Sequence, residues 1–414
     1  MKFEYGCIGE KLKHSFSKEI HNALADYDYG IIEIPKQELE SFAAEKNFKA
    51  VNVTIPYKEM IIPYLYEIDA RAKEIGAVNT VVNRGGKLYG YNTDFYGMTS
   101  LIKRIGINLN DKKVAILGTG GTSKTSFEVA KALGAKEIIK VSRSARANAV
   151  TYEELYQNHT DVEVIINTTP SGMYPNIFDT PVDLSQLKNL CGVVDAVYNP
   201  LRTPLILAAK KRKIPAEGGL YMLVSQAVRA SEIFIDTTYD KSEAERVFKK
   251  IYSEKENIVL TGMPASGKST VGKLISEALG RDFIDTDDII TEDEGKSIPE
   301  IFKEHGEKYF RDAETRAVKK AAALCGKVIA TGGGAILREE NVDALKENGK
   351  LYFIDRPLSE LIPTSDRPLS SDREAIEKRY NERYAIYNST ADVRIEVNSD
   401  AEGVKAKILE DFFK

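Results

Sequence analysis

Cysteine and histidine are scarce in this sequence, which contains 3 and 4 of them among 414 residues. The cysteines Cys7, Cys191 and Cys325 lie far apart without a C-x-x-C pair, and the histidines show no metal-ligand spacing. We therefore expect neither a disulfide framework nor a zinc site. Apolar runs of the roughly 18 residues that a membrane-spanning helix needs are also missing, and no signal-peptide core follows Met1. We expect a soluble, cytoplasmic protein.

A charge excess of either sign is missing too. The 58 basic residues are offset by 62 acidic ones, which leaves a net charge of -4. A basic surface that would bind nucleic acid is therefore not expected. Glycine (29) and proline (14) are too few for extensive disorder or a collagen-like repeat. At about 150 residues per domain, the length predicts roughly two to three domains.

Short strand-like runs alternate with helical patterns along the chain. The runs comprise residues 30–34, 50–53, 114–117, 137–141, 164–166 and 192–195. This alternation predicts an α/β fold with parallel sheets and crossover helices. Between residues 232 and 257 the sequence becomes charged and helical, and a new apolar strand begins at Ile258. We place the main domain boundary near Glu254.

A glycine turn follows the strand at 114–117. It contains Gly118 and Gly120, the first two glycines of a G-x-G-x-x-G motif, and Ser123 occupies the third position. Glycine lets the backbone approach a pyrophosphate, and the N-terminus of the following helix stabilises that group through its free N–H groups. The motif predicts a dinucleotide site, with a tight turn that binds no ligand as the alternative.

The strand at 137–141 ends in Ser142-Arg143-Ser144 instead of an acidic residue. An acidic side chain at this point would hold a free ribose 2′-hydroxyl, whereas an arginine suits a 2′-phosphate. We therefore expect NADP rather than NAD, with Arg143 at the phosphate and Arg146 as a second candidate. The alternative for Arg143 is a solvated surface arginine.

Polar clusters occupy positions where an ordinary core would be apolar. They are Ser15-Phe-Ser17, Asn52-Val-Thr54-Ile-Pro-Tyr-Lys58, Gly76-Ala-Val-Asn79-Thr80 and Gly90-Tyr-Asn92-Thr93-Asp94. Further motifs are Asn167-Thr-Thr-Pro-Ser-Gly-Met-Tyr-Pro175, Asp195-Ala-Val-Tyr198-Asn-Pro200 and Glu217-Gly-Gly219-Leu-Tyr-Met-Leu-Val-Ser-Gln226. Each cluster alone is also consistent with a turn or a helix cap. In this order and spacing they resemble shikimate dehydrogenase over about residues 3–250.

The resemblance implies NADPH-dependent reduction of 3-dehydroshikimate. Lys58 and Asp94 would be the catalytic pair, because an alkoxide that develops on hydride transfer needs a proton that a nearby ammonium can supply. Which of the two carries the proton is left open. The substrate carboxylate would bind Ser15 and Ser17, and the ring hydroxyls would contact Asn52, Thr54, Asn79, Asp94, Tyr198 and Gln226. NADP would contact Gly118, Gly120, Gly121, Thr122, Ser142, Arg143, Ser144 and Gly219.

The implied architecture of this half has two parts. A substrate-binding α/β domain would span 1–100 and be completed by 219–252, and a Rossmann-type NADP-binding domain would span 101–218. The stretch Thr122-Ser-Lys-Thr125 departs from the family, which is often alanine-rich there. This departure leaves the fine geometry of cofactor binding open.

A complete phosphate-loop motif begins the second half. The segment Gly262-Met-Pro-Ala-Ser266-Gly267-Lys268-Ser269 fits G-x-x-x-x-G-K-[ST] and lies between a strand and a helical pattern. Backbone N–H groups of such a loop cradle phosphate, the lysine reaches the outer phosphates, and the serine binds Mg²⁺. We therefore expect contacts to the phosphates of a nucleotide, which would be ATP in a kinase, from Gly262, Ser266, Gly267, Lys268, Ser269 and Thr270.

Several motifs follow this loop in a fixed order. They are Phe283-Ile-Asp285-Thr-Asp287, the capping box Ser297-Ile-Pro-Glu300, Phe310-Arg311-Asp-Ala-Glu314, Ile329-Ala-Thr-Gly332-Gly333-Gly334, Asp366-Arg367 and Arg383. Arg311 and Glu314 are three residues apart, so they share a helix face. The ordered set resembles shikimate kinase over about residues 257–413.

This second resemblance implies a nucleoside-monophosphate-kinase-like P-loop α/β domain with a parallel sheet at 255–414. Asp287 would contact the reacting hydroxyl as base or orienter, and Asp285 would lie near Mg²⁺ through water. Arg311 and Arg383 would clamp the substrate carboxylate, for which planar guanidinium groups are suited. Gly333 would offer its backbone N–H to the substrate, and Arg367, on a lid, would close over the ATP phosphates. For Glu314 and Asp285 the alternative to a role in the site is a structural one, in helix pairing or helix capping.

The two resemblances together predict a bifunctional enzyme, because the product of the first half would be the substrate of the second. It would serve aromatic amino-acid synthesis, and channelling of shikimate is a hypothesis. One alternative is a shikimate-sensing regulator that has kept these folds without their chemistry. The intact Lys58, Asp94, Lys268, Ser269 and Asp287 argue against it. Closer alternatives are quinate as a dehydrogenase substrate and a different small-molecule acceptor for the kinase.

Overall fold

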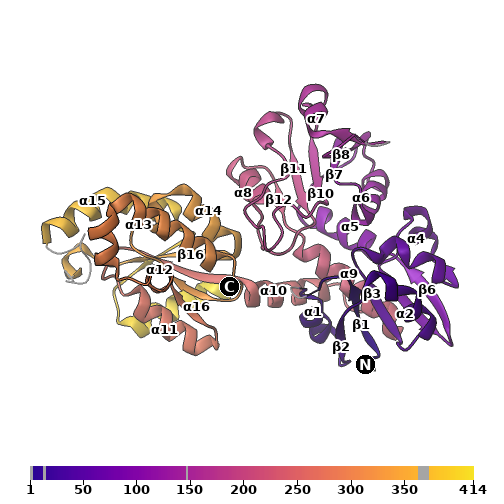
Figure 1. The fold of residues 1–414 in the computed structure, drawn as a ribbon, viewed down its shortest axis with the longest axis horizontal. Helices are drawn as coiled ribbons and strands as arrows, with labels where there is room; N and C mark the ends of the chain where they lie inside the picture. Colours follow the sequence, from indigo (N-terminus) through magenta and orange to yellow (C-terminus); the bar gives the residue numbers. More distant parts are fainter. Residues whose placement is uncertain (1–2, 13–14, 146–147, 362–372) are drawn as a thin grey trace. The chain divides into compact units, whose positions relative to one another are not determined.

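The computed structural model describes residues 3–12, 15–145, 148–361 and 373–414. The chain divides into two compact units, of which the first comprises Met1–Asn199 with Ala208–Ile251 and the second Pro200–Leu207 with Tyr252–Lys414. Within the described ranges the first unit contains two six-stranded sheets and the second a five-stranded sheet (Figure 1). No helix in these ranges is long and apolar enough to cross a membrane.

The first sheet is mixed, with the strand order β2-β1-β3-β5-β6-β4. Its strands are β1 (Tyr5–Gly9), β2 (Tyr29–Glu33), β3 (Ala50–Val53), β4 (Glu67–Ile68), β5 (Thr80–Arg84) and β6 (Lys87–Tyr91). β1 pairs in parallel with β2 and β3, whereas β5 runs antiparallel to β3 and β6. The expectation of parallel strands fails for β5 and β6 because Gly85 and Gly86, both at positive φ, form a two-residue hairpin turn.

The second sheet is parallel throughout, with the order β12-β11-β10-β7-β8-β9. Its strands are β7 (Lys113–Leu117), β8 (Glu137–Ser142), β9 (Val150–Thr151), β10 (Val164–Asn167), β11 (Gly192–Asp195) and β12 (Ala216–Glu217). The six strands expected from the sequence correspond to β2, β3, β7, β8, β10 and β11 to within one residue at either end.

Helices surround the two sheets. They are α1 (Ser17–Leu24), α2 (Leu39–Glu45), α3 (Tyr57–Met60), α4 (Ala70–Ile75), α5 (Asp94–Arg104), α6 (Gly121–Ala132), α7 (Tyr152–Asn158), α8 (Pro204–Lys211), α9 (Leu220–Ile235) and α10 (Glu243–Lys255). The first half of α8 and the last residues of α10 belong to the second unit. β7 and β10 are buried along almost their whole length, as expected for parallel strands covered on both faces. α5 and α9 pack against each other between the two sheets of the unit.

The sheet of the second unit is parallel, with the order β14-β15-β13-β16-β17. Its strands are β13 (Asn257–Thr261), β14 (Phe283–Asp285), β15 (Val328–Ala330), β16 (Gly349–Asp355) and β17 (Val393–Glu396). The helices are α11 (Lys268–Leu279), α12 (Thr286–Glu294), α13 (Ile298–Ala322), α14 (Glu339–Asn348), α15 (Arg373–Thr390) and α16 (Ala401–Phe412). The predicted capping box of Ser297 and Glu300 is confirmed, and Gly306, at φ 78°, breaks α13.

Candidate active sites

The topology of the first sheet gathers polar residues at one edge. β3 is parallel to β1 and antiparallel to β5, and the register pairs Asn52 with Thr80 and Thr80 with Tyr91. The carboxyl ends of β3 and β6 therefore meet the amino end of β5. Thr54 follows β3 directly, and the loops at this edge carry the other clusters singled out in the sequence.

Lys58 and Asp94 form a largely buried ion pair at this edge. The Nζ of Lys58 lies 2.5 Å from Oδ2 of Asp94, and the two side chains are 12% and 8% exposed. The other carboxylate oxygen, Oδ1, accepts a hydrogen bond of 2.9 Å from Nδ2 of Asn79. Asn79 therefore helps to orient the carboxylate of Asp94, and that carboxylate holds the ammonium of Lys58 through its other oxygen.

Asn79 connects this pair to α9. Its Nδ2 also donates to Oγ1 of Thr93 at 3.0 Å and to Oε1 of Gln226 at 3.4 Å. Thr93 in turn donates to Gln226 at 3.2 Å. Gln226 is brought to the site by the packing of α9 against α5, so this contact depends on tertiary structure rather than on local sequence.

Hydrogen bonds also hold other residues that are expected to bind the substrate. The hydroxyl of Tyr29 donates to Oδ1 of Asn52 at 2.7 Å. Ser15 donates through Oγ to Oγ of Ser17 at 3.0 Å. Burial raises the pKa of Tyr198 to about 12, and a hydrogen bond with Ser15 acts in the opposite direction. Tyr29 was not identified from the sequence because it lies outside the polar clusters.

The glycine turn lies beside the ion pair of Lys58 and Asp94. Gly118 adopts φ 108°, a conformation that L side chains rarely adopt, and α6 begins at Gly121. A methyl group on Gly121 would lie 3.5 Å from Cβ of Lys58. Ser123 is fully buried and donates to the carbonyl of Gly118 at 2.7 Å, so the serine in the third motif position still permits close helix–strand packing.

The other expected NADP residues lie in or beside the loops that follow strands of the second sheet. Arg143 is exposed just after β8, and Ser142 donates a hydrogen bond to the carbonyl of Ser144. Thr122 lies in the first turn of α6. A Cβ on Gly219 would lie 2.2 Å from the backbone oxygen of Ala196, so a glycine is required at that position. Arg146, the second phosphate candidate, lies outside the described residues.

The phosphate loop of the second unit has the conformation expected of an anion cradle. Gly262 and Gly267 adopt φ 146° and 95°. The ammonium of Lys268 donates to the carbonyls of Gly262 and Met263 at 3.0 and 2.9 Å, and the residue is 6% exposed. In the described part of the chain the buried hydroxyl of Ser266 has no hydrogen-bond partner. This unsatisfied donor and the glycine-rich backbone fit a phosphate ligand. Thr270, the last of the expected contact residues, is exposed.

Ser269 and Asp285 come together next to this loop. The hydroxyl of Ser269 donates to Oδ2 of Asp285 at 2.8 Å, and Oδ1 of Asp285 accepts from the backbone N–H of Asp287 at 3.1 Å. Hydroxyl and carboxylate oxygens are suitable ligands for Mg²⁺, directly or through water. The described residues contain no group of three or more metal-ligating side chains.

A cavity of about 330 Å³ opens beside these groups. It is lined by Pro264, Asp285, Asp287, Asp288, Thr291, Ile298, Pro299, Phe302, Phe310, Arg311, Glu314, Gly332, Gly333, Gly334, Arg379 and Arg383. The expected face sharing of Arg311 and Glu314 is confirmed by a hydrogen bond of 2.7 Å. Burial raises the pKa of Glu314, and the adjacent Arg311 opposes that shift. Arg383 donates to the carbonyl of Gly333 at 2.9 Å.

Sequence reasoning missed Arg379, which also lines this cavity. It precedes Arg383 by four residues on α15, so the two guanidinium groups can face the same side of the helix. Burial lowers the pKa of Arg379, and the nearby Arg383 adds to that effect. The i, i+4 spacing was the signal available in the sequence. Arg367, expected on a lid, lies outside the described residues.

Comparisons with known proteins follow the same division. A family model of the shikimate dehydrogenase substrate binding domain matches residues 7–81, and one of shikimate kinase matches residues 264–412. The chain is 39% identical over 271 residues to shikimate dehydrogenase (NADP(+)) of Clostridium beijerinckii, which covers 61% of this chain and 98% of that protein. The chain is also 33% identical over 279 residues to a protein of the same name from Staphylococcus epidermidis, and this match covers 61% of this chain and 99% of that protein.

Solved structures agree with this assignment. Shikimate dehydrogenase 1 from Peptoclostridium difficile is 36% identical, with a TM-score of 0.57 and coverage of 61% of this chain and 98% of that chain. A shikimate dehydrogenase solved in complex with NADP+ is 30% identical, with a TM-score of 0.53 and coverage of 60% and 96%. The chain therefore belongs to the shikimate dehydrogenase family over its first part and carries a shikimate kinase domain after it, which makes it a bifunctional enzyme of the shikimate pathway.

Proposed function

We propose that the first unit reduces 3-dehydroshikimate to shikimate with NADPH, and that the second transfers the terminal phosphate of ATP to the ring 3-hydroxyl of shikimate. The observation that carries the first assignment is the buried pair of Lys58 and Asp94 beside the glycine turn. The domain limits expected from the sequence, 1–100 with 219–252, 101–218 and 255–414, are part of this proposal.

The pair is arranged for proton donation to a developing alkoxide. NADPH, when bound, would supply a hydride to the carbonyl carbon. The carbonyl oxygen then needs one proton, and Nζ of Lys58 is the donor, because both oxygens of Asp94 already accept hydrogen bonds. Asn79 and Gln226 lie beside the pair and would hold the ring hydroxyls, while Ser15 and Ser17 would bind the carboxylate.

We infer that Arg143 selects NADPH through its 2′-phosphate. Replacing Arg143 by alanine should raise KM for NADPH by about tenfold and leave the activity with NADH unchanged, since a hydrogen bond to a charged group contributes about 1.5–3 kcal/mol and this side chain is exposed. Steady-state kinetics with both nucleotides provide the measurement. Arg229→Ala removes an exposed arginine from α9 and is the control. An unchanged KM for NADPH in the Arg143 variant would contradict the assignment.

The second unit combines phosphate binding with an acceptor pocket. Lys268 and the loop backbone would hold the ATP phosphates, and Ser269 with Asp285 would hold Mg²⁺, which shields phosphate charge when bound. Asp287 would accept a hydrogen bond from the reacting hydroxyl and orient it. Arg311 and Arg383 would pair with the carboxylate, because both guanidinium groups line the same cavity as Asp287.

Gly334 tests the placement of the acceptor carboxylate. A Cβ at this position would lie 1.9 Å from Nη1 of Arg311, so Gly334→Ala should displace the guanidinium and raise KM for shikimate by at least about tenfold. The dehydrogenase activity should not change. The double variant Gly334→Ala/Arg311→Ala should be no worse than Arg311→Ala alone, because both changes remove the same contact. Additive effects in the kinase assay would place the carboxylate elsewhere.

One experiment tests the complete proposal. The purified protein is incubated with 3-dehydroshikimate, NADPH, ATP and Mg²⁺, each nucleotide is omitted in turn, and the products are identified by mass spectrometry. Shikimate 3-phosphate should form only when both nucleotides are present. Shikimate as the sole product would refute the kinase assignment, and no turnover at all would favour a sensor that has lost its chemistry.

A further inference from the structure

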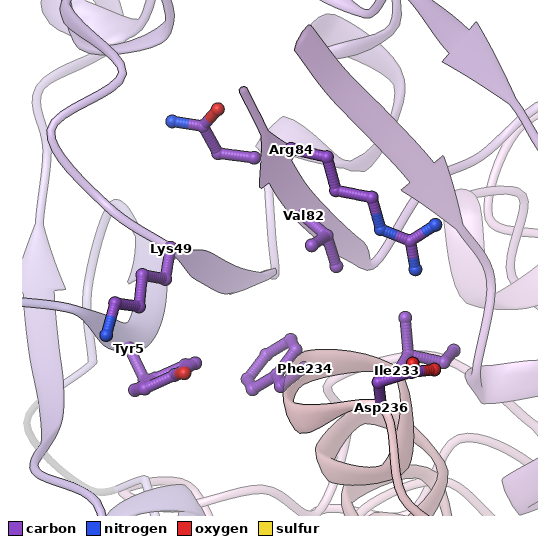
Figure 2. Close-up of a pocket in the computed structure, with 8 residues that line it drawn as sticks. Tyr5, Lys49, Val82, Arg84, Ile233, Phe234 and Asp236 are labelled. Carbon is purple, nitrogen blue, oxygen red and sulfur yellow. The ribbon is translucent and has the colours of Figure 1, made fainter. Parts of the chain in front are cut away.

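A second pocket lies at the opposite end of the first sheet from Lys58 and Asp94. It measures about 270 Å³ and is lined by Tyr5, Lys49, Val82, Asn83, Arg84, Ile233, Phe234 and Asp236 (Figure 2). Tyr5 begins β1 and Lys49 precedes β3, whereas the catalytic edge lies at the other ends of these strands. A strand of this length spans about 15 Å, so the pocket is separate from the catalytic edge.

The floor of the pocket is aromatic. The rings of Tyr5 and Phe234 are 5.8 Å apart between centroids with an interplanar angle of 23°, and the two residues are 9% and 7% exposed. Val82 and Ile233 complete an apolar wall around them. Flat apolar surfaces of this kind favour a flat ring that can stack in an offset or tilted arrangement.

The rim carries charges of both signs. Arg84 extends toward Ile233 and Asp236 (Figure 2). Its guanidinium lies 5.6 Å from the ring centroid of Tyr89, and neither Arg84 nor Asp236 takes part in an ion pair within the described ranges. Lys49 is paired with Glu4 at 2.8 Å. Arg84 and Asp236 therefore place a cation, which contacts the ring of Tyr89, and an anion on the rim of this pocket.

We propose that this pocket binds a small zwitterion with an aromatic side chain, which is the chemistry of an aromatic amino acid. The ligand carboxylate pairs with Arg84, its ammonium pairs with Asp236, and its ring lies on Tyr5 and Phe234. A pocket of about 270 Å³ is at the small end of ligand cavities and accommodates one ring. For a ligand of about a dozen non-hydrogen atoms in an open site, we expect a Kd on the order of 1–10 mM.

Saturation-transfer NMR on the full chain tests the proposal, with L-phenylalanine as the probe. The ring protons should receive the strongest saturation, and the signal should titrate with a millimolar Kd. 3-Phenylpropionate lacks the ammonium and phenethylamine lacks the carboxylate, so each should bind about two- to fivefold more weakly, as expected for one exposed charge pair. Equal binding of all three compounds would overturn the zwitterion assignment.

Two variants locate the binding. Arg84→Ala and Asp236→Asn should each weaken the binding of L-phenylalanine by about two- to fivefold. Asparagine is chosen because residue 236 adopts φ 52°, a conformation that asparagine tolerates. Arg71→Ala removes an exposed arginine elsewhere in the unit and should change nothing. Saturating shikimate should not displace the probe. Wild-type affinity in both rim variants, or displacement by shikimate, would refute the site.

Discussion

Replacing Lys58 by methionine should lower kcat for the reduction of 3-dehydroshikimate by about 10²–10⁴-fold, the usual contribution of a positioned general acid. The ammonium lies 2.5 Å from Asp94, and both are largely withdrawn from water, so no solvent molecule replaces the proton donor with the same geometry. Phosphorylation of shikimate should continue at the wild-type rate, because the residues proposed for phosphoryl transfer all lie in the second unit.

The control for this variant addresses folding. Methionine keeps the aliphatic stem, but it leaves Asp94 buried without its cation, which destabilises a protein by about 3–5 kcal/mol. NADPH binding, measured by nicotinamide fluorescence, should stay within about twofold of the wild type if the first unit remains folded. Lys103→Met changes an exposed lysine on α5 and should preserve both activities. Reduction at the wild-type rate by the Lys58 variant would exclude Lys58 as the donor.

The parts of the fold that could be predicted from the sequence are those with a local physical signal. The phosphate loop, the glycine turn and the capping box of Ser297 and Glu300 each need particular residues at fixed spacing. Strands such as 50–53 and 192–195 are short apolar runs in an alternating pattern, and the structure places β3 and β11 there. Local sequence therefore predicts where each cluster lies along the chain.

Local sequence does not show which clusters meet. Asn79 and Gln226 are 147 residues apart, and their contact depends on the packing of α9 against α5. The hairpin of β5 and β6 was not expected, although Gly85-Gly86 between two apolar runs is a recognised turn signal. Tyr29 holds Asn52 from a strand with no polar motif of its own. The resemblance to known enzymes supplied the proposed roles of these residues, and the topology explains how they come together.

Replacing Lys268 by methionine should reduce the phosphorylation of shikimate by at least about 10²-fold, and dehydrogenase kcat and KM should not change. The ammonium, held by the carbonyls of Gly262 and Met263, lies at the mouth of the phosphate loop. With ATP bound it would stabilise charge that spreads over the transferred phosphate, and no other lysine of the described loop replaces it. The assay couples shikimate-dependent ADP release to mass analysis of shikimate 3-phosphate.

A matched control on the same helix separates this effect from loss of stability. Lys273→Met removes an exposed lysine one turn further along α11 and should leave both activities intact. The Lys268 variant should still bind shikimate, because Arg311 and Arg383 lie on α13 and α15 rather than on the loop. Retained phosphorylation would show that the loop does not hold the transferred phosphate. Loss of the dehydrogenase activity as well would show that the two units do not work independently, since no dehydrogenase residue lies within 255–414 in this assignment.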